Sequence, residues 1–226
     1  MGETLKLFGW KVSPYSHRAE VALRLKGVKY EFIHEDLANK SDMLIRYNPI
    51  LKKIPVLLHG DTPIVESQVI VEYIDEVFDG HPILPKDPYK RAEARFWARF
   101  IDEKVRPQVW MSCWTDGETQ KSFIAQVKES LAILQGRLEG KKFFGGDSIG
   151  LIDIMACSLA LWFGVMQEVV GLNLLNEDDY PELCQWGEEY RNAEAVKECL
   201  PERELIVGFF APRKDRIFAK KAPVYD

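Results

Sequence analysis

The spacing of apolar residues separates a first part with strand and helix patterns from a second part with helical patterns alone. Leu5 and Leu7 alternate with Lys6, which predicts a strand. After a Pro/Ser segment, apolar residues at positions 19, 21, 22 and 25 have helical spacing and end at Lys26 and Gly27. The chain is therefore expected to begin with a strand, a loop and a capped helix.

The following segment predicts a second strand and a short second helix. Residues 30–33 have the composition of a strand. Residues 41–47 have a helical pattern that Ser41 can cap, and the pattern ends before Asn48-Pro49, where proline disfavours helix. Together with the first strand and helix, these segments form a β-α-β-α unit.

A hairpin and a third helix complete the first domain. The short apolar runs 56–58 and 64–65 are joined by a Gly-Asp pair, which is typical of a tight antiparallel hairpin. A helix with an apolar stripe follows, and we expect Ser67 to cap it. A β-α-β unit followed by β-β-α is the thioredoxin-like arrangement.

A proline-rich segment marks the boundary between two predicted domains. Residues 79–90 contain three prolines and one glycine, and proline disfavours helix at itself and at the residue before it. Beyond this segment the strand patterns stop, and apolar residues recur at spacings of three and four. We predict a thioredoxin-like domain over 1–80, a linker over 81–89 and an all-helical domain over 90–226.

Charge and hydropathy exclude several classes of partner. The net charge is −5 and no run of Lys or Arg exceeds two residues, so the basic surface of a nucleic-acid-binding protein is missing. The longest apolar stretch, Leu151 to Met166, is interrupted by Asp153 and is shorter than a bilayer span, so we predict a buried helix. The first residues lack a signal-peptide pattern. The sequence predicts a cytosolic protein without membrane or nucleic-acid partners.

The cysteines and histidines offer no metal-binding or dithiol pattern. The four cysteines are widely spaced and form no C-x-x-C pair, so we expect reduced thiols in or near helices. The four histidines have no partner at the spacing of a metal site or a catalytic triad, and we interpret them as structural or surface residues. No metal or other cofactor is predicted.

The first candidate for chemistry is the segment Ser13 to Arg18, where the first strand meets the first helix. Serine followed by proline at a helix start is ordinary capping chemistry, so this segment by itself does not indicate a catalytic site. A functional interpretation requires further residues.

Two later segments supply such residues. A cis bond at Ile54-Pro55 would turn the backbone of Ile54 outward to pair with a peptide ligand. Ser67, at a helix start, suits a carboxylate, and the adjacent Glu66 suits an ammonium. A capped helix with an exposed acid is the alternative interpretation of this pair, and Lys40 and Lys53 are solvated surface lysines by default.

Taken together, these residues resemble the glutathione site of the cytosolic glutathione transferases, in particular those of the plant tau class. The resemblance rests on an ordered set of stretches that covers most of the chain, and no single motif carries it. The matching stretches are Ser13–Arg18, Glu35–Leu37, Asn39–Ser41, Tyr47–Pro49, Lys52–Leu57, Glu66–Ser67, Glu72–Glu76, Ala94–Trp97 and Phe144–Asp147.

The resemblance implies a role for each residue of the glutathione site. Ser13 would donate a hydrogen bond to the glutathione sulfur, Lys40 and Lys53 would meet the glycine carboxylate, and Ile54 would pair with the cysteinyl backbone. Glu66 and Ser67 would hold the γ-glutamyl end. Glutathione enters as a co-substrate.

The resemblance also implies a hydrophobic acceptor site. Its candidate residues are Trp10, Val12, Tyr15, Arg106, Trp110, Trp162, Phe209 and Phe210. For any one aromatic residue a place in the core is the alternative. Arg106 departs from the aromatic residue expected at this place in many relatives, which leaves the acceptor preference open. Gly150 and Asp153 look like the family's helix cap, with a structural role.

Three functions follow as hypotheses. The first is conjugation of glutathione to hydrophobic electrophiles in detoxification and stress response, with reduction of organic hydroperoxides as a further activity of the same thiolate. The second is a non-catalytic carrier of aromatic small molecules such as flavonoids. The third, a thiol or dehydroascorbate reductase, would require a cysteine near Ser13, and none occurs at positions 11–16. The family also implies a homodimer.

Overall fold

The computed structural model describes residues 4–217 and divides them into two compact units. The α/β unit consists of the chain up to Pro88 together with Ala193–Leu200, and the helical unit consists of Tyr89–Asn192 together with the chain from Pro201 onward. The expected fold class, a thioredoxin-like domain and an all-helical domain, is confirmed.

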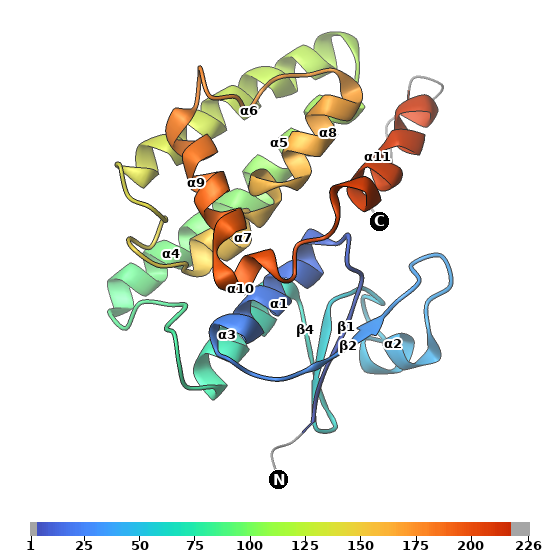
Figure 1. The fold of residues 1–226 in the computed structure, drawn as a ribbon. Coiled ribbons are helices and arrows are strands. Elements are labelled where there is room, and N and C mark those ends of the chain that lie inside the picture. The colour runs from blue at the N-terminus through green and yellow to red at the C-terminus, as the bar shows by residue number, and fades with distance from the viewer. Residues whose placement is uncertain (1–3, 218–226) are drawn as a thin grey trace. The chain divides into compact units, whose positions relative to one another are not determined.

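The α/β unit contains a four-stranded mixed sheet (Figure 1). The strands are β1 (Leu5–Gly9), β2 (Glu31–His34), β3 (Val56–His59) and β4 (Thr62–Val65), in the order β2-β1-β3-β4. β1 is parallel to β2, and β3 is antiparallel to both β1 and β4. Gly60, with φ of 59°, lies in the turn of the β3–β4 hairpin, as the sequence predicted.

The register of the sheet brings four chain segments to one edge. Val56 at the start of β3 pairs with Phe8 near the end of β1 and with Val65 at the end of β4. Gly9, the last residue of β1, pairs with His34, the last residue of β2. The segments that follow β1, β2 and β4 and the segment that precedes β3 therefore leave the sheet at the same edge.

Helices cover both faces of this sheet (Figure 1). They are α1 (Pro14–Leu25), α2 (Asp42–Tyr47) and α3 (Ser67–Val77), and the short α10 (Glu194–Lys197) lies against α1. α1 packs against α3 and α10. Side chains alternate along a strand, so Phe8 and Val56 pack with Leu44 of α2 on one face, while Leu7 and Leu57 lie on the other.

Two of the three predicted helix caps in this unit are confirmed and one is wrong. Ser13 and Ser41 cap α1 and α2, because their side chains accept hydrogen bonds from the backbone N–H of Ser16 and Leu44. Ser67 is instead the first residue of α3, and the cap position belongs to Glu66, which has φ of 70°. The Ser67 hydroxyl lies within hydrogen-bond distance of the Arg18 side chain.

The helical unit is built from α4 (Pro88–Phe100), α5 (Arg106–Trp114), α6 (Gly117–Leu138), α7 (Leu151–Ala160), α8 (Trp162–Val170), α9 (Pro181–Asn192) and α11 (Arg203–Ile217). A π-helical turn, η1 (Ile101–Val105), joins α4 to α5, and Pro107 lies in the first turn of α5, where proline is tolerated. α5 packs on α6, α7 on α9, and α8 on α11.

The apolar stretch that begins at Leu151 forms the core of the helical unit. Nine of the ten residues of α7 are buried. By length and composition, residues 151–170 would suffice to cross a membrane, but 72% of the most apolar window lies inside the protein, which is typical of a core helix. The predicted buried helix is confirmed, with an interruption at Leu161, where α7 ends and α8 begins.

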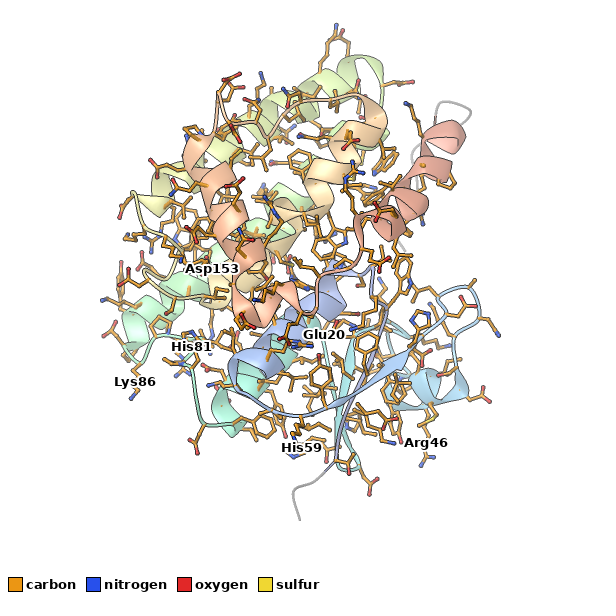
Figure 2. All side chains as sticks on the ribbon, in the orientation of Figure 1. Glu20, Arg46, His59, His81, Lys86 and Asp153 are labelled. Carbon is orange, nitrogen blue, oxygen red and sulfur yellow. The ribbon has the colours of Figure 1, made fainter. Side chains whose placement is uncertain are left out.

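Asp153 of α7 fixes the start of this core helix from inside the unit (Figure 2). Its carboxylate accepts hydrogen bonds from the backbone N–H of Gly150 at 2.9 Å, the backbone N–H of Phe144 at 2.9 Å and Trp186 Nε1 at 2.8 Å. Burial raises the pKa of Asp153 to about 6, although these donors act in the opposite direction. The expected cap between Gly150 and Asp153 is present.

Candidate active site

The predicted glutathione-site residues of the α/β unit all lie in segments that leave the sheet at the edge described above. Ser13 follows β1, and Lys40 lies in the loop after β2. Lys53 and Ile54 precede β3, while Glu66 and Ser67 follow β4. Residues that are far apart in the sequence are thus gathered by the sheet register rather than by any local motif.

Ser13 occupies the cap position of α1 and is buried, with 5% of its surface exposed. Its side-chain oxygen accepts a hydrogen bond from the backbone N–H of Ser16 at 3.3 Å, and its backbone N–H donates to the Trp10 carbonyl at 2.9 Å. Accepting that bond uses a lone pair of the oxygen and leaves the hydroxyl proton to be donated. The group also lies at the positive end of the helix dipole. This geometry suits stabilisation of an anion.

Arg18, to which the sequence analysis assigned no role, contacts one of the predicted site residues. Its side chain is 1% exposed, and Nη1 donates to the Ser67 hydroxyl at 3.2 Å. Its guanidinium also lies 5.1 Å from the centre of the Tyr15 ring. A buried guanidinium holds its partner in one geometry, so Arg18 connects α1 to the start of α3. The available signal was the position of Arg18 five residues after Ser13.

The segments that carry Lys40 and Lys53 are fixed by buried polar side chains. Glu35, 2% exposed, accepts hydrogen bonds from the Ser41 hydroxyl at 2.6 Å and the Ser41 backbone N–H at 3.2 Å, which closes the loop that carries Lys40. The Asn48 side-chain amide donates to the Lys53 carbonyl at 2.9 Å. Both lysines are exposed. Their backbones are therefore ordered while their ammonium groups face solvent.

Among the remaining residues of the predicted site, the peptide bond before Pro55 has the geometry that the peptide-binding interpretation requires. The Ile54-Pro55 peptide bond is cis, as predicted. Ile54 is half-buried and packs beside the cluster of Phe8 and Val56. Glu66 is exposed and Ser67 is buried. Of the predicted acceptor residues in this unit, Val12 is buried, and Trp10 and Tyr15 are half-buried.

In the helical unit, part of the predicted acceptor site forms one aromatic cluster. The Trp110 and Phe210 ring centres lie 6.4 Å apart, and those of Phe209 and Phe210 lie 5.1 Å apart. Trp114, which the sequence reasoning did not select, completes the cluster at 5.6 Å from Trp110 and 5.8 Å from Phe210. Its position one helical turn after Trp110 was the available signal.

The other two predicted acceptor residues of this unit are Arg106 and Trp162. Arg106 is half-buried at the start of α5, 3.9 Å from the Asp102 carboxylate. Trp162 is buried with 3% of its surface exposed and lies in α8, which packs against α11. This burial favours a place in the core, which was the alternative interpretation, and the same holds for Trp114 and Phe210, which are 1% and 4% exposed.

The four cysteines are structural residues rather than reactive thiols. All four cysteines are free, and burial raises the pKa of Cys113 to about 12. His17 is buried in the α/β unit, where burial lowers its pKa to about 4. Among residues 4–217, no group of three or more His, Cys, Asp or Glu side chains is arranged to hold a metal ion. The candidate chemistry rests on Ser13.

Comparison with known proteins bears on the whole chain. Residues 3–76 match the family described as "Glutathione S-transferase, N-terminal domain". Residues 96–194 match the family described as "Glutathione S-transferase, C-terminal domain". The crystal structure of a tau-class glutathione S-transferase from mango, Mangifera indica, is 44% identical, with a TM-score of 0.86, and covers 91% of this chain and 96% of that one. The chain belongs to the tau class of the glutathione S-transferase family.

Other relatives of this glutathione transferase agree over nearly its full length. A probable glutathione S-transferase from Glycine max is 45% identical over 220 residues, which are 97% of this chain and 98% of the relative. Glutathione S-transferase U8 from Arabidopsis thaliana is 44% identical over 208 residues, 91% of this chain and 93% of the relative. A rice glutathione transferase crystallised with glutathione is 33% identical, has a TM-score of 0.87 and covers 96% of this chain and 98% of that one.

The family membership establishes the activity. The protein is an enzyme with glutathione transferase activity, and the first of the three hypotheses drawn from the sequence is confirmed at that level. The resemblance to the tau class, which rested on an ordered set of stretches, is confirmed as well.

Proposed function

We propose that this glutathione transferase activates the glutathione thiol through Ser13 and transfers the sulfur to a hydrophobic electrophile. One observation carries the proposal. Ser13 caps α1 with its oxygen as acceptor, so its hydroxyl proton is available at a helix N-terminus, at the sheet edge where the other predicted glutathione residues emerge.

Ser13 needs only to stabilise the thiolate of glutathione, and its geometry suits this role. A cysteine thiol has a pKa near ~8.5 and is mostly protonated at neutral pH, so stabilising the thiolate raises the concentration of the nucleophile. A hydroxyl donor and the helix dipole both favour the anion. Because no cysteine lies at positions 11–16, a mixed disulfide with the enzyme is disfavoured, and attack of the thiolate on an electrophilic carbon is the preferred step.

The rest of the peptide would be held by the neighbouring segments. Lys40 and Lys53 are exposed ammonium groups on ordered backbone, suited to the glycine carboxylate. Ile54 precedes β3 and offers its backbone to the cysteinyl residue. Glu66 and Ser67 lie at the start of α3 and suit the γ-glutamyl ammonium and carboxylate, with Arg18 fixing the Ser67 hydroxyl. The rice relative was crystallised with glutathione, which supports glutathione as the ligand of this fold.

A carrier of aromatic molecules is the second candidate function, and the aromatic cluster of the helical unit favours it. Trp110, Trp114 and Phe210 are in mutual ring contact, and Phe209 contacts Phe210. Aromatic side chains bind flat apolar ligands through large contact areas at low entropic cost. In the enzyme interpretation, Trp110, Phe209 and Phe210 of this cluster belong to the hydrophobic acceptor site that the family resemblance implies. Peroxide reduction would use the same thiolate.

We also propose a cytosolic homodimer. Each unit exposes large apolar side chains of the kind that interfaces cover: Ile50 and Val69 are 89% and 54% exposed in the α/β unit, and Tyr89 and Phe96 are 75% and 62% exposed in the helical unit. Sedimentation equilibrium should give twice the mass of one chain. A mass equal to one chain at micromolar concentration would contradict the dimer.

The experiment for the enzyme proposal compares wild type, Ser13→Ala and Ser13→Thr. Turnover of glutathione with a chlorinated nitrobenzene is measured together with the glutathione Kd of each protein. Ser13→Ala should lower kcat by about tenfold to hundredfold, because one hydrogen-bond donor to the developing anion is lost, while Ser13→Thr should recover most of the rate. The glutathione Kd should change little, since Lys40, Lys53, Glu66 and Ser67 remain.

Equal rates for wild type and Ser13→Ala would contradict the assignment of Ser13. Binding of a flavonoid-like ligand below about micromolar Kd, unaffected by Ser13→Ala, would then favour the carrier. Failure to bind any aromatic ligand would remove the carrier function instead.

A further inference from the structure

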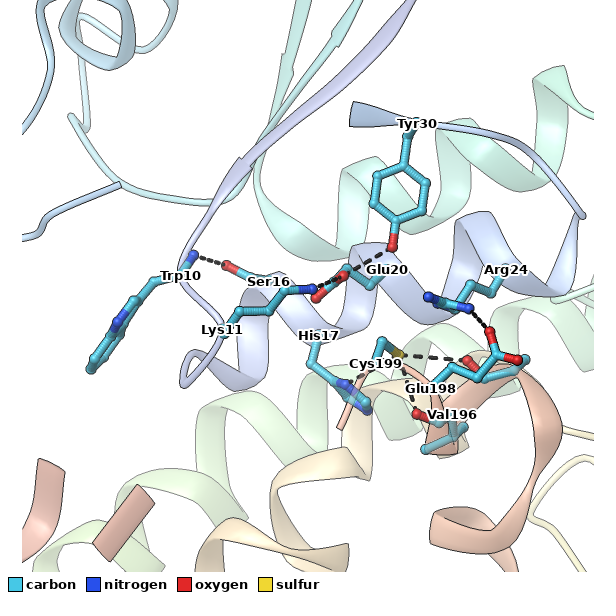
Figure 3. Close-up of polar contacts among 11 residues, drawn as sticks. Trp10, Lys11, Ser16, His17, Glu20, Arg24, Tyr30, Val196, Glu198 and Cys199 are labelled. Atoms are coloured by element: carbon cyan, nitrogen blue, oxygen red, sulfur yellow. Dashed lines mark hydrogen bonds and ion pairs between the residues drawn. The ribbon is translucent and has the colours of Figure 1, made fainter. Parts of the chain in front are cut away.

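A stripe of polar side chains runs along the buried face of α1 (Figure 3). Ser16, Glu20 and Arg24 follow one another at intervals of four residues, which places them on one side of the helix. Ser16 is 0% exposed and Glu20 is 1% exposed. Buried polar groups of this kind are retained where they hold partners in place.

Glu20 holds two partners from outside the helix. Lys11 Nζ lies 2.6 Å from Glu20 Oε1, and the Tyr30 hydroxyl donates to the same oxygen at 2.9 Å. Lys11 belongs to the loop between β1 and α1, two residues before Ser13, while Tyr30 directly precedes β2. Burial, together with the charge and hydrogen bond of Glu20, raises the pKa of Tyr30.

The Lys11 side chain is directed to Glu20 rather than left in water. It is 44% exposed, whereas the Glu20 side chain is 2% exposed. Its ammonium also lies 4.1 Å from the centre of the Phe32 ring on β2. A buried carboxylate requires a charged or hydrogen-bonded partner, so the pairing places a constraint on the conformation of the loop.

Ser16 provides a second anchor for the same loop. Its hydroxyl accepts a hydrogen bond from the Trp10 backbone N–H at 3.1 Å, and Ser13 N–H in turn donates to the Trp10 carbonyl at 2.9 Å. A side chain on Gly9 would place its Cβ 2.8 Å from Ser16 Oγ, so the close approach of strand and helix requires glycine there. Consecutive residues of the loop are thus tied to residues 16 and 20 of α1.

We propose that Glu20 is a positioning residue for glutathione transfer: through Lys11 it holds the loop that orients the Ser13 hydroxyl toward the thiol. This inference rests on the proposed role of Ser13. Glu20 itself is buried and reaches the Ser13 loop through Lys11, while its second partner, Tyr30, precedes β2. The expected consequence is a change in how well Ser13 stabilises the thiolate, without an equal change in glutathione binding.

The test uses the full chain and three variants of this pair: Glu20→Gln, Lys11→Met and the double variant. Lys26→Met is the matched control, because Lys26 forms a buried ion pair with Asp75 at 2.7 Å at the opposite end of α1. For each protein, kcat, KM for glutathione and the pH dependence of kcat/KM are measured, and the thiolate of bound glutathione is titrated by its ultraviolet absorbance. Ser13→Ala is measured beside them.

Glu20→Gln and Lys11→Met should each lower kcat by about tenfold, less than the roughly hundredfold cost of a ~1 Å misplacement, and raise the apparent pKa of the bound thiol. KM for glutathione should stay within about twofold. The double variant should resemble the single variants, because all three remove the same interaction. Lys26→Met should lose stability but keep the pH profile of the wild type.

Two outcomes would overturn the proposal. In the first, both pair variants retain the wild-type kcat and pH profile while Ser13→Ala loses rate, so that only the positioning role fails. In the second, Ser13→Ala is as active as wild type, so that the role of Ser13 fails and the positioning role with it. Should Glu20→Gln fail to fold, Lys11→Met decides alone, since its partly exposed side chain can be replaced at the surface.

Discussion

Replacement of Asp153 should destabilise the protein more than any change at an exposed acid. The carboxylate is 0% exposed and accepts hydrogen bonds from Phe144 N–H, Gly150 N–H and Trp186 Nε1. In Asp153→Ala two of these donors, on Phe144 and Trp186, remain in residues that are 3% and 2% exposed. Each buried donor without an acceptor costs about 1–3 kcal/mol, and loss of the helix cap costs ~1 kcal/mol more. The expected loss in unfolding free energy is about 3–7 kcal/mol.

Asp153→Asn should give an intermediate loss of about 2 kcal/mol. The amide keeps one oxygen as an acceptor but presents its NH2 group to a donor, so one hydrogen bond is replaced by repulsion. Asp178→Asn is the control, because Asp178 is exposed in the same unit and should shift stability by less than about 0.5 kcal/mol.

The titration of Asp153 adds a second signature. Its folded pKa, about 6, lies above the model-peptide value of 3.8, so between these values the folded state binds more protons than the unfolded state. The stability contributed by this group is present at low pH and is lost as the pH rises through 6. The difference in unfolding free energy between wild type and Asp153→Asn should therefore be about 1 kcal/mol larger at pH 5 than at pH 7.

Equilibrium urea unfolding, followed by far-ultraviolet circular dichroism and tryptophan fluorescence at both pH values, measures these differences. If Asp153→Ala unfolds at the same urea concentration as Asp178→Asn, the network around Asp153 does not stabilise the helical unit and the reasoning is refuted. An unchanged m-value is needed to attribute the shift to stability.

Two further predictions concern the α/β unit. Burial lowers the pKa of His17 in the folded state from 6.5 to about 4, so between these pH values the unfolded state binds more protons than the folded state. The free energy of unfolding should therefore fall by about 3 kcal/mol as the pH decreases from 6.5 to 4. In urea unfolding, His17→Gln should show a smaller fall over this range, and the same pH dependence as wild type would contradict the prediction. Gly9→Ala should lower the free energy of unfolding by about 1–3 kcal/mol in the same assay, because the added Cβ would lie 2.8 Å from Ser16 Oγ. If Gly9→Ala is as stable as wild type, the strand and helix can move apart without cost.

The order and type of the elements could be read from the sequence because they depend on local patterns. Alternation at Leu5 and Leu7, the helical stripe that ends at Gly27 and the hairpin turn at Gly60 each act within a few residues. Capping by Ser13 was predictable for the same reason, since the acceptor and the N–H donor are three residues apart. The cap assigned to Ser67 was wrong because Ser67 begins α3, one residue beyond the cap position at Glu66, and its hydroxyl is in contact with Arg18, 49 residues away.

The sequence by itself determined the fold class, the family and the residue types available for binding glutathione, because these follow from local periodicity and from an ordered set of short stretches. Only the tertiary structure placed the segments of Ser13, Lys40, Ile54 and Ser67 at one sheet edge, since strand register depends on pairing between distant parts of the chain. It alone showed the contact between Glu20 and Lys11, because burial, unlike composition, decides which charged side chain must find a partner.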